Sequence, residues 1–110
     1  MLAAFFLCLS ATAVDGDTLR CANVDEANGR VRLARIDTPE RGEGGYERAT
    51  EALAALIAGA EVRCQLVDAD PRVLGFQPRD RFGRPVARCY SAGRDLGAAL
   101  IEMGHAEVWP

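Results

Sequence analysis

The sequence has 110 residues, of which 49% are hydrophobic and 26% are charged. These values predict one globular domain over residues 1–110 and exclude a disordered chain. The net charge of −3 argues against a protein that holds nucleic acid through bulk positive charge. All thirteen basic residues are arginine, which offers a bidentate fork for phosphate, although GC-rich coding gives the same bias.

The cysteines are widely spaced and form no C-x-x-C pair, which argues against a zinc site. An even number of them permits two disulfides, but four buried thiols in strands are an equal alternative. The sequence leaves both open for Cys8, Cys21, Cys64 and Cys89.

The N-terminal stretch "MLAAFFLCLSATA" is apolar and ends in a sequence similar to a signal-peptidase site. It lacks the positive region that precedes a signal sequence, so the pattern favours a first strand. The run is too short to span a membrane, and no transmembrane segment is expected. Localisation stays open, with a periplasmic or secreted protein as the alternative.

Three strands are predicted in the first third of the chain. Residues 5–14 are apolar and predict a buried strand that stops at the turn signal Asp15-Gly16. Residues 18–24 and 31–36 predict two further strands, joined through the hairpin signal Asn28-Gly29. Successive short connections make the three strands antiparallel.

The period changes at Tyr46, where apolar residues fall on one helical face until Gly59. Residues 62–66 alternate as a half-buried strand, and a polar loop over 68–80 leads to a strand over 85–90. Asp95 can cap a last helix that ends at Gly104. Five short strands with a helix after the third predict an α+β fold: a five-stranded OB-type β-barrel with two helices.

Two acidic motifs lie at the ends of predicted strands: "VDGDT" and "RIDTPE". If the flanking strands pair, Asp17 and Asp37 meet at one end of the sheet. Neighbouring carboxylates repel unless a cation or proton lies between them, and such oxygen ligands suit calcium or magnesium. The alternative is ordinary turn chemistry, which explains Asp-Gly but not the second acid.

A helix N-terminus is the local alternative for "RIDTPE". Asp37 would be the N-cap, Glu40 would follow three residues later, and Pro39 would lie in the first turn. Glycines follow immediately, and no apolar period begins before Tyr46. The capping interpretation is therefore weak.

Arginines mark two further candidate positions. Arg32 lies on a strand among apolar neighbours, where an arginine extends outward or pairs with an acid. Three more, Arg79, Arg81 and Arg84, cluster in "RDRFGRPVA" around Phe82, where the alternative is a solvated loop.

Together, "VDGDT", "VRLARIDTPE", "DRFGRPVA" and "LIEMGHAEV", in this order, resemble the staphylococcal nuclease (thermonuclease-like) family over most of the chain. The resemblance implies an OB-type barrel and a calcium-dependent nuclease that cleaves DNA or RNA and leaves a 3′-phosphate. It implies calcium ligands at Asp17, Asp37 and the Thr38 carbonyl. It also implies a catalytic glutamate at Glu40 and phosphate-binding arginines at Arg32 and Arg84.

The sequence departs from the family pattern in three places. Phe82 stands where many members have tyrosine. We therefore expect Phe82, with Arg81 beside it, to bind substrate by base stacking and without a hydroxyl contact to the phosphate. The loop after Glu40 is shorter than in the best-known members of the family. The third family helix is expected to be absent, with Trp109 as a substitute aromatic surface. We expect a monomer.

Two other function classes compete with the nuclease. A non-catalytic nucleic-acid or protein-interaction module uses the same barrel, but it has little use for acids that repel phosphate. A glycosidase would use Asp37 and Glu40, but no aromatic sugar platform accompanies them.

Overall fold

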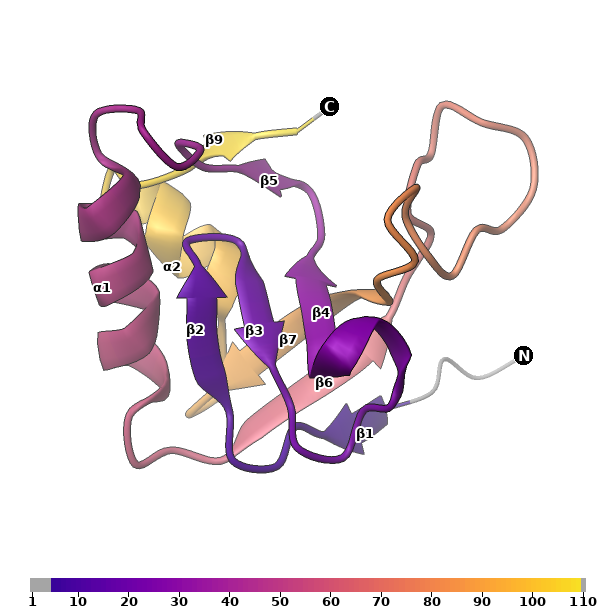
Figure 1. The fold of residues 1–110 in the computed structure, drawn as a ribbon, viewed down its shortest axis with the longest axis horizontal. Helices are drawn as coiled ribbons and strands as arrows, with labels where there is room; N and C mark the ends of the chain where they lie inside the picture. The colour runs from indigo at the N-terminus through magenta and orange to yellow at the C-terminus, as the bar shows by residue number, and fades with distance from the viewer. Residues whose placement is uncertain (1–4, 110) are drawn as a thin grey trace.

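A computed structural model describes residues 5–109, and it has the predicted mixed α+β composition with two α-helices (Figure 1). In chain order the elements are β1 (Phe5–Leu7), β2 (Thr12–Asp15), β3 (Thr18–Arg20), the 3₁₀ turn η1 (Glu26–Gly29), β4 (Arg30–Leu33), β5 (Ile36–Asp37), α1 (Tyr46–Ile57), β6 (Val62–Leu66), β7 (Val86–Ser91), β8 (Arg94–Asp95), α2 (Leu96–Glu102) and β9 (Glu107–Val108).

The main sheet has the strand order β1-β6-β7-β4-β3-β2, with β8 paired to β7, and β5 pairs separately with β9. Only the β4–β7 pair is parallel among the described strands. Residues 5–15 supply both ends of the sheet, because β1 pairs with β6 and β2 pairs with β3. This topology is compatible with an OB-type fold, although the pairing does not by itself close a barrel.

The predicted continuous strand over residues 5–14 is wrong. The chain turns between β1 and β2, and Ser10 has a φ of 50°. The side chain of Asn23 explains the break, since it donates to the Leu7 carbonyl (2.7 Å) and accepts from the Leu9 N–H (2.9 Å). An amide that bonds the backbone in this way replaces a partner strand. The first four residues of the chain lie outside the described part.

The second and third predicted strands are shorter than expected. β3 ends at Arg20, and η1 occupies the predicted hairpin turn, although β3 and β4 do pair antiparallel. The predicted strand over residues 31–36 is interrupted by a turn at Ala34 and Arg35, where Arg35 has a φ of 65°. That turn directs Asp37 into a separate two-stranded sheet.

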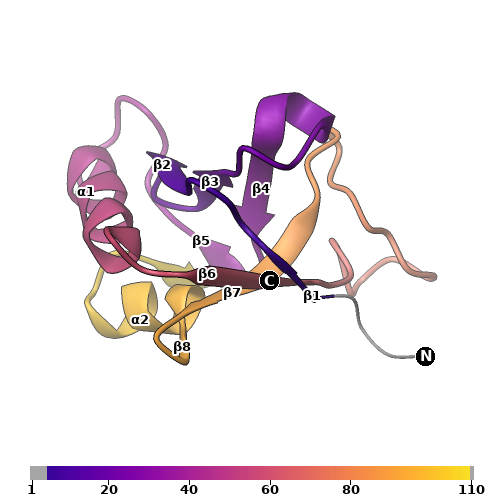
Figure 2. The same cartoon turned by 90° about the horizontal axis from the view of Figure 1, so that it is seen from below.

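Both predicted helices are confirmed. Gly59, with a φ of 66°, follows the end of α1, and the Asp95 carboxylate accepts a hydrogen bond from the Ala98 N–H (3.0 Å) at the start of α2. The helices lie side by side at one end of the sheet (Figure 2). They bury their apolar faces in the core, whose largest members include Leu19, Leu33, Ile36, Leu53, Leu96 and Leu100.

All four cysteines form disulfides, so of the two alternatives the structure has the two disulfides and not four thiols. Cys8 is bonded to Cys21, and Cys64 is bonded to Cys89. The second bond joins directly opposed residues of β6 and β7 in the buried interior. One disulfide thus joins β6 to β7, and the other joins the residues that directly follow β1 and β3.

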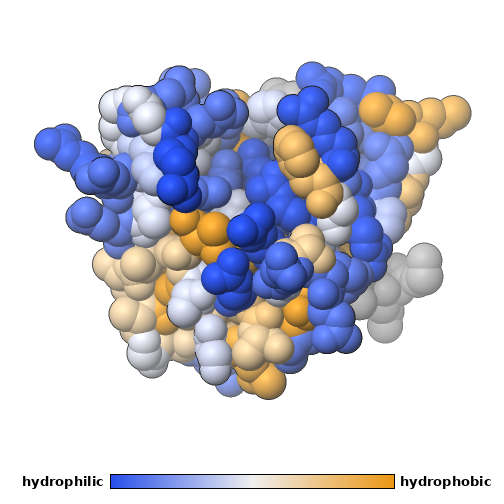
Figure 3. Space-filling model, in the orientation of Figure 1, coloured by the Kyte–Doolittle hydropathy of each residue, from blue (hydrophilic) through white to orange (hydrophobic). Residues whose placement is uncertain are grey.

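The predicted loop before β7 is confirmed, but its tip is apolar rather than polar. Leu74 is fully exposed and Phe76 is 63% exposed. The loop extends away from the sheet (Figure 1), and its apolar tip stands out at the edge of the space-filling view (Figure 3). Within residues 5–109, neither helix is long and apolar enough to cross a membrane.

Candidate functional site

The turn between β2 and β3 carries Asp17 and packs closely against two neighbouring segments. Gly16 is buried in this turn, and a Cβ added to it would lie 2.7 Å from the Ala49 Cβ of α1. The same atom would lie 3.2 Å from the Thr38 hydroxyl. Only glycine fits this position without a shift of its neighbours. The "VDGDT" and "RIDTPE" motifs are therefore adjacent in space.

A chain of polar contacts joins Asp17 to both predicted phosphate-binding arginines. The Thr18 hydroxyl donates to Asp17 Oδ1 (2.8 Å), and Arg84 Nη1 donates to the Thr18 oxygen (3.1 Å). On the other side, Arg32 Nη2 lies 3.4 Å from Asp17 Oδ2. The Arg32 guanidinium thus contacts the Asp17 carboxylate directly, whereas the Arg84 guanidinium reaches it through the Thr18 hydroxyl.

Arg32 is fixed by backbone carbonyls as well as by its ion pair. Its Nη1 donates to the Leu33 carbonyl (2.6 Å), and its Nη2 donates to the Ile36 carbonyl (2.9 Å). The side chains of Arg32 and Asp17 are each 17% exposed. Of the two alternatives expected for Arg32, the structure has the pairing with an acid, and the Leu33 and Ile36 carbonyls on either side of the turn at Ala34 and Arg35 orient it.

Arg84 is oriented by Asp80 within a tight turn. Arg84 Nε and Nη2 both lie 2.8 Å from Asp80 Oδ2, while Asp80 Oδ1 accepts from the backbone N–H groups of Phe82 and Arg84. Both side chains are less than one-fifth exposed, at 19% and 18%. This turn is therefore an organised element and not a loosely solvated loop.

Asp37 lies on β5, directly opposite Glu107 of β9, and both residues are exposed. Like charges directly opposed on paired strands repel. Neither the sequence pattern nor the family resemblance predicted Glu107 near Asp37. The pair places two exposed carboxylates side by side at the β5–β9 pair.

Thr38 and Glu40 continue the chain after Asp37. Thr38 is 6% exposed, and its hydroxyl has no hydrogen-bond partner among the described residues. Glu40 is exposed, and its backbone N–H donates to the Glu43 carboxylate (2.6 Å). No helix begins at Asp37, so the capping alternative is excluded.

The donor chemistry of this region suits a hard divalent cation, because carboxylate and carbonyl oxygens are the ligands that such ions prefer. Within residues 5–109, no three His, Cys, Asp or Glu side chains are grouped closely enough to hold a metal by themselves. A calcium site here would therefore need the Thr38 carbonyl and water in addition to Asp17 and Asp37. The buried, unpartnered Thr38 hydroxyl marks unused hydrogen-bonding capacity beside them.

The predicted substrate-binding residues lie on two different surfaces. Phe82 is 65% exposed, and the guanidinium carbons of Arg81 and Arg84 lie 4.8 Å and 5.2 Å from its ring centroid. Trp109 follows β9, and its backbone N–H donates to the Arg35 carbonyl (2.9 Å). The guanidinium carbon of Arg72 lies 4.8 Å from the centroid of the Trp109 ring. The aromatic platforms are thus Phe82 beside Arg84 and Trp109 near the β5–β9 pair.

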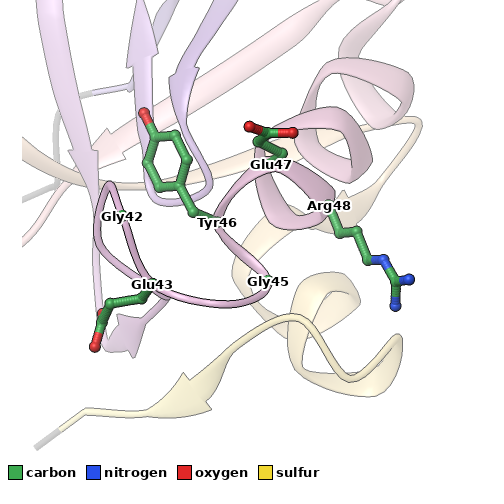
Figure 4. Close-up of a pocket in the computed structure, with 6 residues that line it drawn as sticks. All are labelled: Gly42, Glu43, Gly45, Tyr46, Glu47 and Arg48. Atoms are coloured by element: carbon green, nitrogen blue, oxygen red, sulfur yellow. The ribbon is translucent and has the colours of Figure 1, made fainter.

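A tyrosine at the start of α1 ties the helix to the turn that carries Asp17. The Tyr46 hydroxyl donates to the Asp15 carboxylate, which raises the pKa of Tyr46, with burial adding to the effect. Figure 4 shows the Tyr46 ring directed toward the strands, whereas Arg48 points away from them. Asp15 and Tyr46 therefore position the turn, and neither was identified from the sequence.

Replacing Tyr46 with phenylalanine is expected to lower stability at neutral pH and to flatten its alkaline dependence. The folded protein holds the protonated phenol more strongly than the unfolded chain does. The wild-type contact therefore stabilises the fold below the unfolded tyrosine pKa of about 10 and is lost as pH rises through the higher folded value. Thermal unfolding of both proteins from neutral pH to above pH 10 measures this. A difference in stability between the two proteins that stays constant across that pH range would contradict the contact between Tyr46 and Asp15.

Two further residues at the site were missed by sequence reasoning. Thr18 connects Asp17 with Arg84, and Asp80 orients Arg84. The spacing of Asp80 four residues before Arg84 is a local signal that would have predicted their pairing. No local signal connects Thr18 with residue 84.

The staphylococcal nuclease homologue family model matches residues 30–110 of this chain. The match includes "RIDTPE" and "DRFGRPVA" but begins after "VDGDT". Most of the candidate site therefore falls within the matched region.

Curated relatives carry different names. A succinoglycan biosynthesis protein, ExoI, of Rhizobium meliloti is 35% identical over 108 residues, covering 87% of this chain and 49% of that protein. An uncharacterized endonuclease of Haemophilus influenzae is 28% identical over 92 residues, covering 84% of this chain and 46% of that protein. Protein ParB of Escherichia coli is 32% identical over 102 residues, covering 84% and 51%. The chain spans about half the length of these relatives.

Proposed function

Since the chain belongs to the staphylococcal nuclease homologue family, we propose that it is a calcium-dependent nuclease that hydrolyses phosphodiester bonds of DNA or RNA. Relatives named as endonucleases support a nuclease-type function. The finer assignment to calcium and to particular products rests on the chemistry of the site.

The observation that carries the proposal is the contact chain from Arg84 through Thr18 and Asp17 to Arg32. It brings two oriented guanidinium groups into one contact network with the Asp17 carboxylate, Arg32 directly and Arg84 through the Thr18 hydroxyl. A phosphate bound between these arginines would receive hydrogen bonds from two planar forks. A non-catalytic binding surface has no evident use for the carboxylate between them.

The two arginines would stabilise negative charge on the phosphate oxygens as it develops during hydrolysis. Because Asp80 already holds Arg84, that side chain needs little reorganisation when substrate binds, and two backbone carbonyls limit the movement of Arg32. Binding requires Arg32 to turn part of its fork from Asp17 toward phosphate. A cation at Asp17 would favour this exchange, since it replaces the charge that Arg32 supplies.

Asp17, Asp37 and the Thr38 carbonyl are the residues that would hold calcium. When bound, the ion would add positive charge next to the phosphate and neutralise the two aspartates. The Glu107 carboxylate opposite Asp37 increases the negative potential that attracts such an ion.

Glu40 would act as the general base. It lies three residues after Asp37 on an exposed segment, where its carboxylate can accept a proton from an attacking water. In-line attack would form a bond from the water oxygen to phosphorus and break the bond between phosphorus and the 5′ oxygen. That oxygen takes a proton from solvent and departs as a 5′-hydroxyl, leaving a 3′-phosphate. Phe82 with Arg81 would stack a base on one surface beside the site, and Trp109 is a candidate stacking residue on the other surface.

Cleavage of single-stranded DNA with calcium, and then with a chelator, tests the proposal. Wild-type protein is expected to cleave only with calcium. Glu40→Gln should reduce kcat about 10³-fold, because it removes the base while retaining shape. Glu51→Gln, an exposed acid on α1, is the matched control and should retain full activity.

Full activity in Glu40→Gln would exclude that residue as the base. Absence of calcium-dependent cleavage together with binding of the same DNA would favour the alternative, a non-catalytic nucleic-acid-binding module. Absence of both would leave a protein-interaction module on the same fold.

A further inference from the structure

Two arginines outside the proposed site are directly opposed on the β3–β4 pair. Arg20 of β3 is the register partner of Arg30 of β4, and Thr18 is the partner of Arg32. Side chains two residues apart on a strand point to the same face. Arg20 and Arg30 therefore continue the face that carries Thr18 and Arg32, about 7 Å farther along the strands.

This opposed pair has no compensating acid within residues 5–109. Neither arginine has a carboxylate within ion-pair distance there, although both are exposed. Like charges directly opposed across a sheet destabilise it. Arg20 is also held in place, because its Nε donates to the Asn28 carbonyl (3.2 Å). An anion would stabilise two opposed cations of which one, Arg20, is already held in place.

A hollow of about 440 Å³ lies next to this pair, lined by Ala27, Asn28, Arg30, Phe82 and Arg84. Its lining joins an exposed aromatic ring to two guanidinium groups and one amide. Figure 3 shows hydrophilic residues over the centre of this face, where β3, β4 and η1 lie in Figure 1. The hollow therefore connects the opposed pair with Arg84 of the proposed site.

Both walls of the hollow are structurally fixed. In the η1 wall, a Cβ on Gly29 would lie 2.7 Å from the Cys21 carbonyl, and Cys21 is itself in a disulfide. In the other wall, the Asp80 carboxylate binds two backbone N–H groups of the turn that presents Phe82. An ion pair between Glu26 and Arg79 joins the two walls.

We propose that Arg20 and Arg30 bind a phosphate next to the one held by Arg32 and Arg84, and that the adjoining hollow receives a base stacked on Phe82. This rests on the proposed function for the identity of the ligand as a nucleic acid. The step between the two arginine positions is close to the repeat of successive phosphates in an extended strand. The substrate is therefore single-stranded DNA or RNA that follows the β3–β4 pair toward η1.

Fluorescence anisotropy with a chelator present tests the path without cleavage. The probe is an oligothymidylate of about ten nucleotides. Arg30→Ala and Arg20→Ala should each weaken binding about three- to tenfold at low salt. Each should also make the slope of log K against log salt concentration shallower by about 0.7 for the phosphate contact that is lost. Arg63→Ala is the matched control, since Arg63 is exposed on β6, two strands away from β4.

Cleavage with calcium gives a second, independent measurement. Arg30→Ala should lower kcat/KM more for the oligonucleotide than for a thymidine dinucleotide, through KM, because the dinucleotide has no second phosphate to bind. Equal affinity, salt dependence and length preference in Arg30→Ala and wild type would overturn the path. If wild type binds as expected but cleaves nothing, the nuclease proposal fails and the binding path stands. If wild type does not bind the oligonucleotide, the binding path fails, and calcium-dependent cleavage alone then decides whether the nuclease proposal stands.

Discussion

Replacing Arg84 with alanine is expected to reduce cleavage about 10³-fold, equivalent to ~4 kcal/mol of transition-state stabilisation. Asp80 and Thr18 hold the Arg84 guanidinium at three nitrogens, so the side chain is already oriented before substrate binds. Its removal takes away a prearranged donor to the developing negative charge. Arg84→Lys should recover little activity, because an ammonium cannot reproduce the planar fork.

Single-turnover cleavage with excess enzyme measures this loss in the chemical step. Arg88→Ala is the matched control, since Arg88 is exposed on β7 and pairs with Asp95. Thermal unfolding checks that the turn survives, which is expected because Asp80 still accepts from two backbone N–H groups. Activity of Arg84→Ala close to that of Arg88→Ala would remove Arg84 from the mechanism.

Removing the Cys64–Cys89 disulfide is expected to lower the free energy of unfolding by about 3 kcal/mol. The bond closes a sequence separation of 25 residues and lies between two fully buried positions of β6 and β7. Its loss therefore increases the entropy of the unfolded chain and leaves a small packing defect. For a domain of this size, that is a large part of the total stability.

Urea unfolding of Cys64→Ala/Cys89→Ala against wild type, without reductant, measures the change. The comparison variant is Cys8→Ala/Cys21→Ala, whose bond spans a separation of only 13 residues. Its loss should cost slightly less in the chain-entropy account. An unchanged urea midpoint for the Cys64–Cys89 variant would mean that this bond contributes no net stability.

Sequence reasoning succeeded where the signal was local. The helix after Tyr46 and the Asp95 cap follow from apolar spacing and one capping side chain, and both are present. For Arg32 among its apolar neighbours, the pattern left two alternatives, and pairing with an acid is the one present. Metal binding by Asp17 and Asp37 stays a prediction.

It failed where distant residues decide the outcome. The strand expected over residues 5–14 is broken by Asn23, whose side-chain amide bonds two backbone groups of that segment. Glu107 meets Asp37 only because β9 pairs with β5 across most of the chain. Strand pairing at such separations depends on the whole fold and leaves no mark in a short sequence window.

The contact between Gly16 and Ala49 has a consequence for sequence variation. With only 2.7 Å between a new Cβ on Gly16 and the Cβ of Ala49, the two positions share one small volume. A larger residue at Gly16 is acceptable only if Ala49 becomes smaller, so the two positions should covary among homologues and behave non-additively in a double-mutant cycle. Ala49→Gly is thus the substitution that would accommodate Gly16→Ala. The identity of a helix residue thereby limits which residues can stand one position before Asp17.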